Sequence, residues 1–296
     1  MNSIYTAKIL ANKNQYAGRE WCYDFRELNK RFNEETSKKV RLSLAESYSK
    51  LTKEWNAERN SEWLCRIYLS AKMIMTATLQ LNALDYAGKK NFRLVAPYLA
   101  YYSIFSLARS IVYTIPEQDW KQGELVKISH NKALNIAFNH VSKFDEELSS
   151  KLKKYTLKVK AYRELISYRA PSSGDSNVGS VDDINSMATL LAEVAQFNSE
   201  ILEASIIKNA NDESFIFVEK YIHDLSNVKI ESECFFDKED CYRLKYFKRK
   251  YPVAPNILHI MREGHIEDFF GSWVDHEESD DSFNTNNNWQ LIFDLP

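Results

Sequence analysis

Apolar side chains recur every three or four residues over the first two-thirds of the chain, which is the pattern of amphipathic α-helices. One run with this spacing begins at Trp21 and ends at Phe32, and a second extends from Ser37 to Trp55. Because only a short polar stretch separates the two runs, they predict an N-terminal helical hairpin within residues 1–58.

Five stronger runs with helical spacing follow between residues 59 and 210. Gly88, Pro116 and Pro171 end three of them, as glycine and proline commonly end helices. Ser180 with Asp183 three residues later resembles a capping box at the start of the last run. The runs occupy residues 61–88, 94–115, 129–141, 148–166 and 180–204. Together they predict one helical bundle.

The pattern changes after about residue 209. Short runs rich in β-forming residues appear at 214–218, 228–236, 242–246 and 289–293, and one further helix is expected over 256–270. This mixture predicts a small α+β module. The expected fold is therefore mainly α: a helical extension (1–58), a helical bundle (59–210) and a C-terminal α+β module (211–296).

The composition is that of an ordinary globular protein. The chain has 296 residues, of which 44% are hydrophobic and 27% charged, and its formal net charge is -2. These values exclude disorder along the whole chain. The 7 glycines form none of the glycine-rich loops that hold nucleotide phosphates, which argues against the common nucleotide-binding folds.

The sequence gives no reason to expect a metal, a cofactor or a membrane span. The four cysteines form no C-x-x-C pair, and the segment 261–273 (MREGHIEDFFGSW) lacks a recognised ligand spacing. Arg109 and four tyrosines interrupt the most apolar stretch, 94–115, so a buried bundle helix is the better interpretation. The N-terminus does not read as a signal peptide. We therefore expect a cytoplasmic protein with free thiols.

Four stretches of the bundle region carry a family resemblance. They are AYYSIFSLAR at 100–109, SHNK at 129–132, YRELISY at 162–168 and AEVAQF at 192–197. In their order along the chain and in their residue types, they resemble the HEPN superfamily. Its members are small helical bundles common in prokaryotic toxin–antitoxin and antiviral defence systems. The resemblance covers about half of the chain, roughly residues 60–208.

The resemblance implies a specific chemistry. Catalytic HEPN proteins are metal-independent ribonucleases in which an arginine and a nearby histidine of one helix usually meet their copies across a dimer and activate the ribose 2'-hydroxyl. In this chain no histidine has an arginine five to seven residues before it. Arg163 and Tyr168 stand at the matching place. Since a phenol has a pKa near 10 and is a poor general base, the usual reaction is expected to be absent or weak.

Other roles remain open for these residues. Tyr168 could donate a hydrogen bond or stack on a base, and His130 could approach Arg163 from the preceding helix. In the alternative interpretation, Arg163 is a surface or interface arginine paired with a carboxylate, Tyr168 is a packing aromatic, and His130 is a residue in the first turn of a helix.

A basic stretch at 243–251 (RLKYFKRKY) is the best local candidate for nucleic-acid binding. Its cations alternate with aromatic side chains, and a strand would bring several of them to one side. The alternative is an exposed edge strand that lysines protect from aggregation. The candidate cations are Arg243, Lys245, Lys248, Arg249 and Lys250.

These features lead to three functional hypotheses. In the first, the chain is a HEPN-like component of a prokaryotic defence or toxin–antitoxin system that acts through a homodimer or a complex with a partner protein, and that holds RNA or single-stranded nucleic acid without cleaving it. In the second, it is a metal-independent endoribonuclease that uses Arg163 with Tyr168 or another residue. In the third, it is a purely structural or regulatory subunit.

Overall fold

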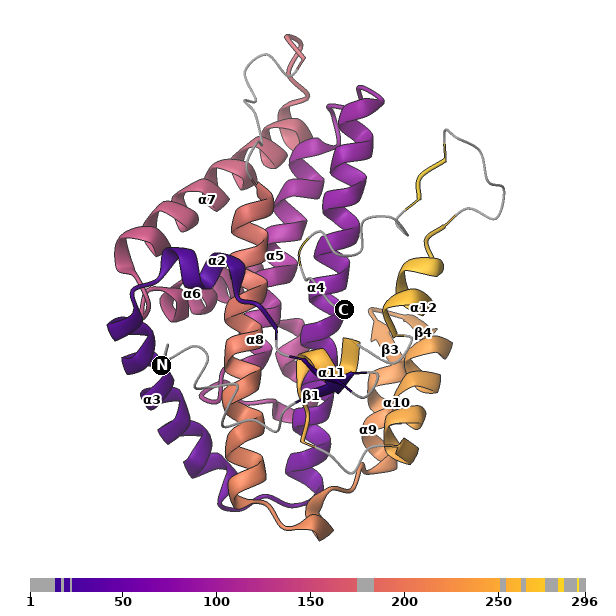
Figure 1. The fold of residues 1–296 in the computed structure, drawn as a ribbon. Helices are drawn as coiled ribbons and strands as arrows, with labels where there is room; N and C mark the ends of the chain where they lie inside the picture. Colours follow the sequence, from indigo (N-terminus) through magenta and orange to yellow (C-terminus); the bar gives the residue numbers. More distant parts are fainter. Residues whose placement is uncertain are drawn as a thin grey trace.

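Long helices form the body of the protein (Figure 1). The computed structural model describes residues 14–16, 19–21, 23–174, 184–250, 254–261, 265–274, 282–284 and 292. The bundle consists of α4 (Ala57–Lys89), α5 (Ala96–Thr114), α6 (His130–Val141), α7 (Glu146–Arg169) and α8 (Ile184–Asn209), and a 3-10 turn (Lys121–Lys127) precedes α6. Within 57–174 and 184–209 the structure contains no strand, so the five helices predicted from the sequence are present.

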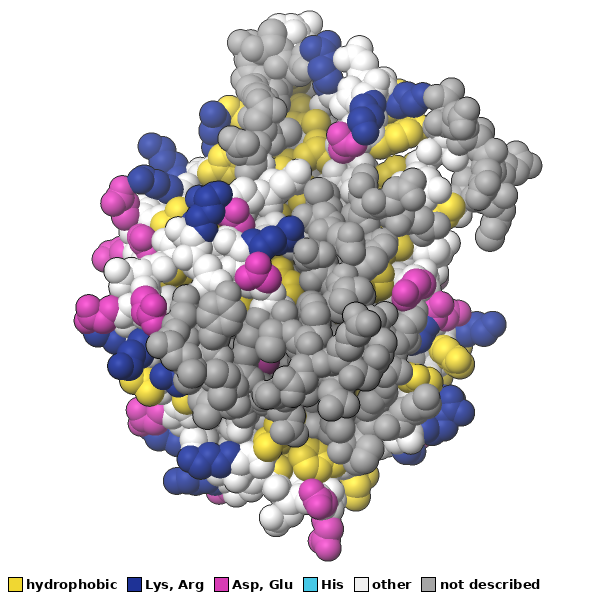
Figure 2. Space-filling model, viewed as in Figure 1, with side chains coloured by type: hydrophobic (Ala, Val, Ile, Leu, Met, Phe, Trp, Pro, Cys, Tyr) yellow, Lys and Arg dark blue, Asp and Glu magenta, His cyan; other side chains and the backbone are white. Residues whose placement is uncertain are grey.

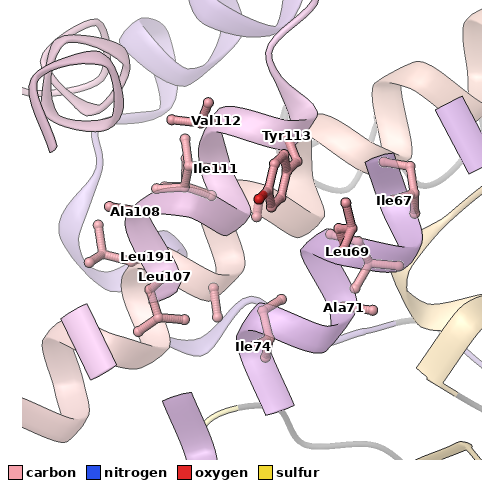
Figure 3. Close-up of a cluster of buried hydrophobic side chains, with 14 of the residues drawn as sticks. Ile67, Leu69, Ala71, Ile74, Leu107, Ala108, Ile111, Val112, Tyr113 and Leu191 are labelled. Carbon is pink, nitrogen blue, oxygen red and sulfur yellow. The ribbon is translucent and has the colours of Figure 1, made fainter. Parts of the chain in front are cut away.

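The helices α4, α5 and α8 form the centre of the bundle. Figure 3 shows Ile74 of α4, Leu107 and Ile111 of α5, and Leu191 of α8 gathered in one apolar cluster. All four side chains are fully buried. The apolar stretch 94–115 is therefore a core helix, as expected. No described helix is both long and apolar enough to cross a membrane.

The buried side chain of Arg66 fastens α4 to the end of α5. Its guanidinium donates hydrogen bonds to the carbonyl oxygens of Tyr113, Ile115 and Gln118 at 2.8, 2.6 and 2.8 Å. Its Cζ also lies 3.8 Å from the centroid of the Trp63 ring. The last carbonyls of a helix lack partners within the helix. Arg66 supplies a donor to one of them, that of Tyr113, and also holds two carbonyls of the chain that follows α5.

The N-terminal segment contains a short hairpin and two helices. Strands β1 (Asn14–Tyr16) and β2 (Arg19–Trp21) pair antiparallel, and α2 (Arg26–Arg31) and α3 (Glu34–Thr52) follow. Both helices pack on α8. The second predicted helix is confirmed, but the prediction that the first begins at Trp21 is wrong, because Trp21 lies in β2.

A side chain from the bundle determines where α2 begins. The Glu193 carboxylate of α8 accepts hydrogen bonds from the backbone N–H groups of Glu27 and Leu28 at 3.0 and 2.6 Å, and from the Tyr23 hydroxyl at 3.3 Å. Phe25, the residue before the helix, provides no side-chain cap. Because the acceptor comes from a distant helix, no local sequence signal marks this boundary.

The C-terminal segment is a small α+β region against α4. It comprises a 3-10 turn (Asp212–Ser214), α9 (Glu219–Ser226), β3 (Asn227–Ile230), β4 (Glu233–Phe236), α10 (Lys238–Lys250), α11 (Ile257–Met261) and α12 (His265–Gly271). The run 228–236 is confirmed as strand and forms an antiparallel hairpin, in which Val228 pairs with Phe235. The described residues of the run 256–270 are helical in α11 and α12, and residues 262–264 lie outside the described part of the chain. The run 289–293 lies outside the described residues except for Ile292.

Two of the predicted strands are wrong. The run 214–218 ends a 3-10 turn and continues as irregular chain, and the run 242–246 lies inside α10. Leu244 and Phe247 are buried and three residues apart, which fits a helix that packs one side on Tyr68 of α4. The burial of one side of α10 therefore determines the conformation of this run, although its polar and aromatic residues alternate as they do in a strand.

Candidate functional site

Arg163 of α7 lies across an aromatic face of α5. Its Cζ is 4.8 Å from the ring centroid of Tyr101 and 5.9 Å from that of Tyr102. Nη1 donates to the Tyr102 hydroxyl at 3.4 Å, and Nη2 contacts Oε1 of Glu164 at 3.2 Å. The side chain is 14% exposed. Arg163 is thus paired with a carboxylate, as the alternative interpretation expects, but it also stacks on two tyrosines in a partly open position.

His130, the first residue of α6, reaches the same aromatic face. Its Nδ1 lies 2.9 Å from the Tyr101 hydroxyl, and its ring stacks on Phe105 with centroids 3.9 Å apart. The ring of Tyr102 meets it edge-on at 5.9 Å. His130 and Arg163 therefore share two tyrosines as neighbours. We call Tyr101, Tyr102, Phe105, His130 and Arg163 the Tyr101 cluster.

The protonation states in the Tyr101 cluster follow from burial and charge. Burial lowers the pKa of His130 below its usual value, and the nearby cations Arg163, Lys160 and Arg109 lower it further. Burial also raises the pKa of Tyr101 to about 12, against the opposing effect of Arg163. At neutral pH the cluster therefore presents a neutral imidazole, a protonated phenol and a guanidinium. This set can bind a phosphate and exchange hydrogen bonds with a hydroxyl group.

A groove between α6 and α7 adjoins the Tyr101 cluster. Its cavity volume is about 360 Å³, and it is lined by Asn131, Leu134, Asn135, Phe138, Lys153, Thr156, Leu157 and Lys160. Lys160 donates a hydrogen bond to Oδ1 of Asn131 at 3.0 Å, and Asn131 follows His130 in the chain. Lys160 thus belongs to the wall of the α6–α7 groove and also contributes to the field at His130.

The helix α7 carries a strongly positive stretch. Six cations and no carboxylate occur between residues 151 and 163: Lys151, Lys153, Lys154, Lys158, Lys160 and Arg163. Figure 2 shows dark blue side chains along the upper left of the molecule, where Figure 1 places α7. No binding site was predicted at this stretch, although the string SKLKKYTLKVKAYR contains the signal.

Tyr168 stands apart from the cluster. It lies in the last turn of α7 and is 77% exposed. The neighbouring Ser167 hydroxyl lies 3.0 Å from the Tyr98 hydroxyl of α5, so the end of α7 is held through that residue. The structure brings together Arg163 and His130, and it leaves Tyr168 in solvent instead of packing it against the chain.

The C-terminal basic stretch is a helix, so the expected strand with alternating cations is wrong. Arg243 is buried and forms an ion pair with Asp268 of α12, and Lys248 pairs with Glu219 of α9. Lys245, Lys248 and Arg249 are exposed on one side of α10. Of Lys250, the structure describes the backbone but not the side chain. Only part of the predicted basic surface is therefore available to a ligand.

The segment 261–273, whose sequence lacks a recognised metal-ligand spacing, is only partly described. Arg262 and Glu263 lie outside the described residues. His265 is buried and lies 5.3 Å from the Tyr68 ring, and burial lowers its pKa to about 3. Among the residues that the structure covers, no group of three His, Cys, Asp or Glu side chains is placed to hold a metal ion.

No protein-family model, no curated protein and no solved structure matches this chain.

Proposed function

We propose that this chain is a HEPN-like component of a prokaryotic defence or toxin–antitoxin system, that it acts through assembly with a second copy or a partner protein, and that it binds RNA on the face formed by α5, α6 and α7. The observation that supports RNA binding is the Tyr101 cluster beside the positive stretch of α7. Cations next to aromatic rings are the combination that recognises phosphates and unstacked bases.

Each residue of the Tyr101 cluster can contact a particular chemical group of RNA. The guanidinium of Arg163 can donate to a phosphate and is already oriented by two tyrosine rings. The neutral imidazole of His130 and the tyrosine hydroxyls can hydrogen-bond to a ribose 2'-hydroxyl, a group that DNA lacks. The resemblance of residues 60–208 to HEPN proteins points to the same class of ligand.

A binding measurement with a matched control tests the proposal. Fluorescence anisotropy of a labelled single-stranded RNA at 50 and 200 mM salt should show binding that weakens as salt rises, since phosphate contacts release counterions. Arg163→Ala should weaken binding about tenfold, in keeping with the loss of one charge-assisted contact. Arg59→Ala, which removes a partly exposed arginine paired with Glu54 at the start of α4, should bind like the wild type.

Two results would contradict the proposal. One is the absence of RNA binding by the wild type at 50 mM salt. The other is an equal loss of affinity in the two arginine variants, because this would reduce the role of Arg163 to its contribution to overall charge.

A second candidate function is metal-independent RNA cleavage, which the contact between His130 and Tyr101 favours. If His130 Nδ1–H donates to the Tyr101 hydroxyl, the free Nε2 can accept the proton of a ribose 2'-hydroxyl, and Arg163 can stabilise the charge that develops on the phosphate. The 2'-oxygen then bonds to phosphorus, and the 5'-oxygen leaves with a proton from water. The products are a 2',3'-cyclic phosphate and a 5'-hydroxyl.

Cleavage is tested separately from binding. Purified protein is incubated with the same RNA in EDTA, and the 3' ends of any products are examined. Loss of cleavage in both His130→Gln and Arg163→Ala, with activity retained in Tyr168→Phe, would support this candidate. Intact RNA with the wild-type protein would exclude it under these conditions and leave the binding proposal standing.

A further inference from the structure

We infer that the α6–α7 groove is a subsite for one unstacked nucleotide of single-stranded RNA. This inference deepens the proposed function and rests on it, because the groove adjoins the Tyr101 cluster. It assigns a role to residues outside the four stretches that carry the HEPN resemblance, chiefly Lys153, Asn135 and Leu157.

The polar side chains of the groove stand on two facing edges. Lys153 and Lys160 are seven residues apart on α7, which places them on the same side of the helix and about 10 Å apart along its axis. Asn131 and Asn135 are exposed and four residues apart on α6, so they also share a side. No described carboxylate pairs with Lys153. One edge therefore offers cations for phosphates, and the other offers amide groups that can read the edge of a base.

The floor of the groove is apolar. Its apolar lining consists of Leu134 and Phe138 of α6, which are almost completely buried, and of Leu157 of α7. Leu157 is 49% exposed although it is aliphatic. An apolar floor between polar edges suits the flat face of a nucleobase, whose edges carry hydrogen-bonding groups.

The size of the groove favours a single strand over a duplex. Cavities that hold small organic ligands begin at about 300 Å³, and this groove lies at that lower end. A base in a duplex is stacked and paired, so it cannot enter such a concavity, whereas the bases of a single strand can be splayed out. The positive stretch of α7 favours a polyanion over an apolar protein segment.

The groove and the Tyr101 cluster form one continuous track. Lys160 contacts Asn131 in the wall of the groove, and Arg163 follows about 4.5 Å further along the axis of α7. A strand with one base in the groove can therefore pass its backbone along Lys153 and Lys160 to Arg163.

The experiment measures the anisotropy of a labelled single-stranded RNA of mixed sequence over a salt series, with the same sequence as a duplex and as single-stranded DNA. Lys153→Ala should weaken binding of the single-stranded RNA about tenfold and reduce the slope of log affinity against log salt by about 0.7. Lys154→Ala removes the same charge from the next position of α7, about 100° around the helix axis. Lys154 does not line the groove, so the difference between the two variants isolates the contact made there.

Leu157→Ser tests the apolar floor. We expect it to weaken binding of the single strand about fivefold, to leave the salt slope unchanged and to leave duplex binding unchanged. Since Leu157 is half exposed, the variant should keep the helical circular dichroism and the thermal midpoint of the wild type.

The outcomes separate this inference from the proposed function. If Arg163→Ala weakens RNA binding while Lys153→Ala matches Lys154→Ala and Leu157→Ser matches the wild type, the groove inference is wrong and the proposed function stands. Equal affinity for single strand and duplex, or displacement of the RNA by a polyglutamate peptide at equal charge, would also overturn it. Single-stranded DNA that binds like RNA would keep the groove and remove the role of the 2'-hydroxyl. A wild type that binds no RNA removes both proposals.

Discussion

Replacing His140 by glutamine measures how much acid sensitivity one buried imidazole gives to the fold. His140 lies on α6 and is almost completely buried. Its Nε2 lies 3.1 Å from Oδ1 of Asn198 on α8, while its Nδ1 has no hydrogen-bond partner among the described residues. Since Oδ1 is an acceptor, Nε2 carries the proton and donates it. A second proton would therefore have to sit on Nδ1, in a buried position without an acceptor.

The size of the effect follows from the pKa of this group. Burial, with a smaller contribution from Lys143, lowers the pKa of His140 from 6.5 to about 4. The folded protein therefore binds fewer protons than the unfolded chain between these values, and the free energy of unfolding falls as the pH falls from 6.5 to 4. A gap of this width corresponds to about 3 kcal/mol.

Urea unfolding, followed by circular dichroism, measures this contribution. His140→Gln keeps a donor for Asn198 but cannot be protonated. Between pH 7.5 and 4.5, the wild type should lose about 2 to 3 kcal/mol more of its free energy of unfolding than this variant loses. His265 is present in both proteins, so its titration cancels in the difference.

The matched control is His223→Gln, which makes the same substitution at a histidine whose side chain is 76% exposed. This variant should follow the wild type at every pH. If His140→Gln loses as much stability as the wild type on acidification, the reasoning from burial of His140 is refuted.

Three further substitutions test other contacts. Arg66→Met removes the donors for three carbonyls in and after the last turn of α5, so the free energy of unfolding should fall by about 3 kcal/mol or more in urea; a change below about 1 kcal/mol would contradict this role. Burial raises the pKa of Glu193 to about 7, so the folded wild type holds a proton that the unfolded chain has lost. Its stability should fall by about 3 kcal/mol as the pH rises from 4.5 to above 7, and the same urea series should show no such fall for Glu193→Gln. Asn33→Ala removes the side-chain cap of α3 and should cost about 1 kcal/mol of unfolding free energy, whereas an unchanged thermal midpoint would show that the cap contributes little.

The elements best predicted from the sequence are those whose own side chains determine their structure. The run 61–88 has an apolar side with helical spacing, and the structure has α4 there, with Asn56 as its side-chain cap. The start of α2 was not predictable in this way, because the acceptor for its first N–H groups is Glu193 of α8. The strand predicted at 242–246 failed for a related reason: the burial of Leu244 and Phe247 against the bundle decides the conformation, and a short run does not reveal it.

The candidate site was only partly predictable for the same reason. Arg163 and His130 were each singled out from the sequence, but their common neighbours Tyr101 and Tyr102 lie on a third helix, α5. Which residues of α5 face α6 and α7 depends on how the helices pack, and spacing within one helix does not specify this. The positive stretch of α7, in contrast, needs no knowledge of packing and could have been recognised from the sequence.

The contact between Glu193 and the start of α2 also orders events during synthesis. The Leu28 amide and its acceptor are separated by 165 residues. While the ribosome is still making the middle of the chain, the amides at the start of α2 have only water as partners. The N-terminal segment must therefore wait for α8 to emerge before it docks, and a nascent chain that stalls ahead of α8 would expose Phe25 and Leu28, two side chains that the finished protein buries completely.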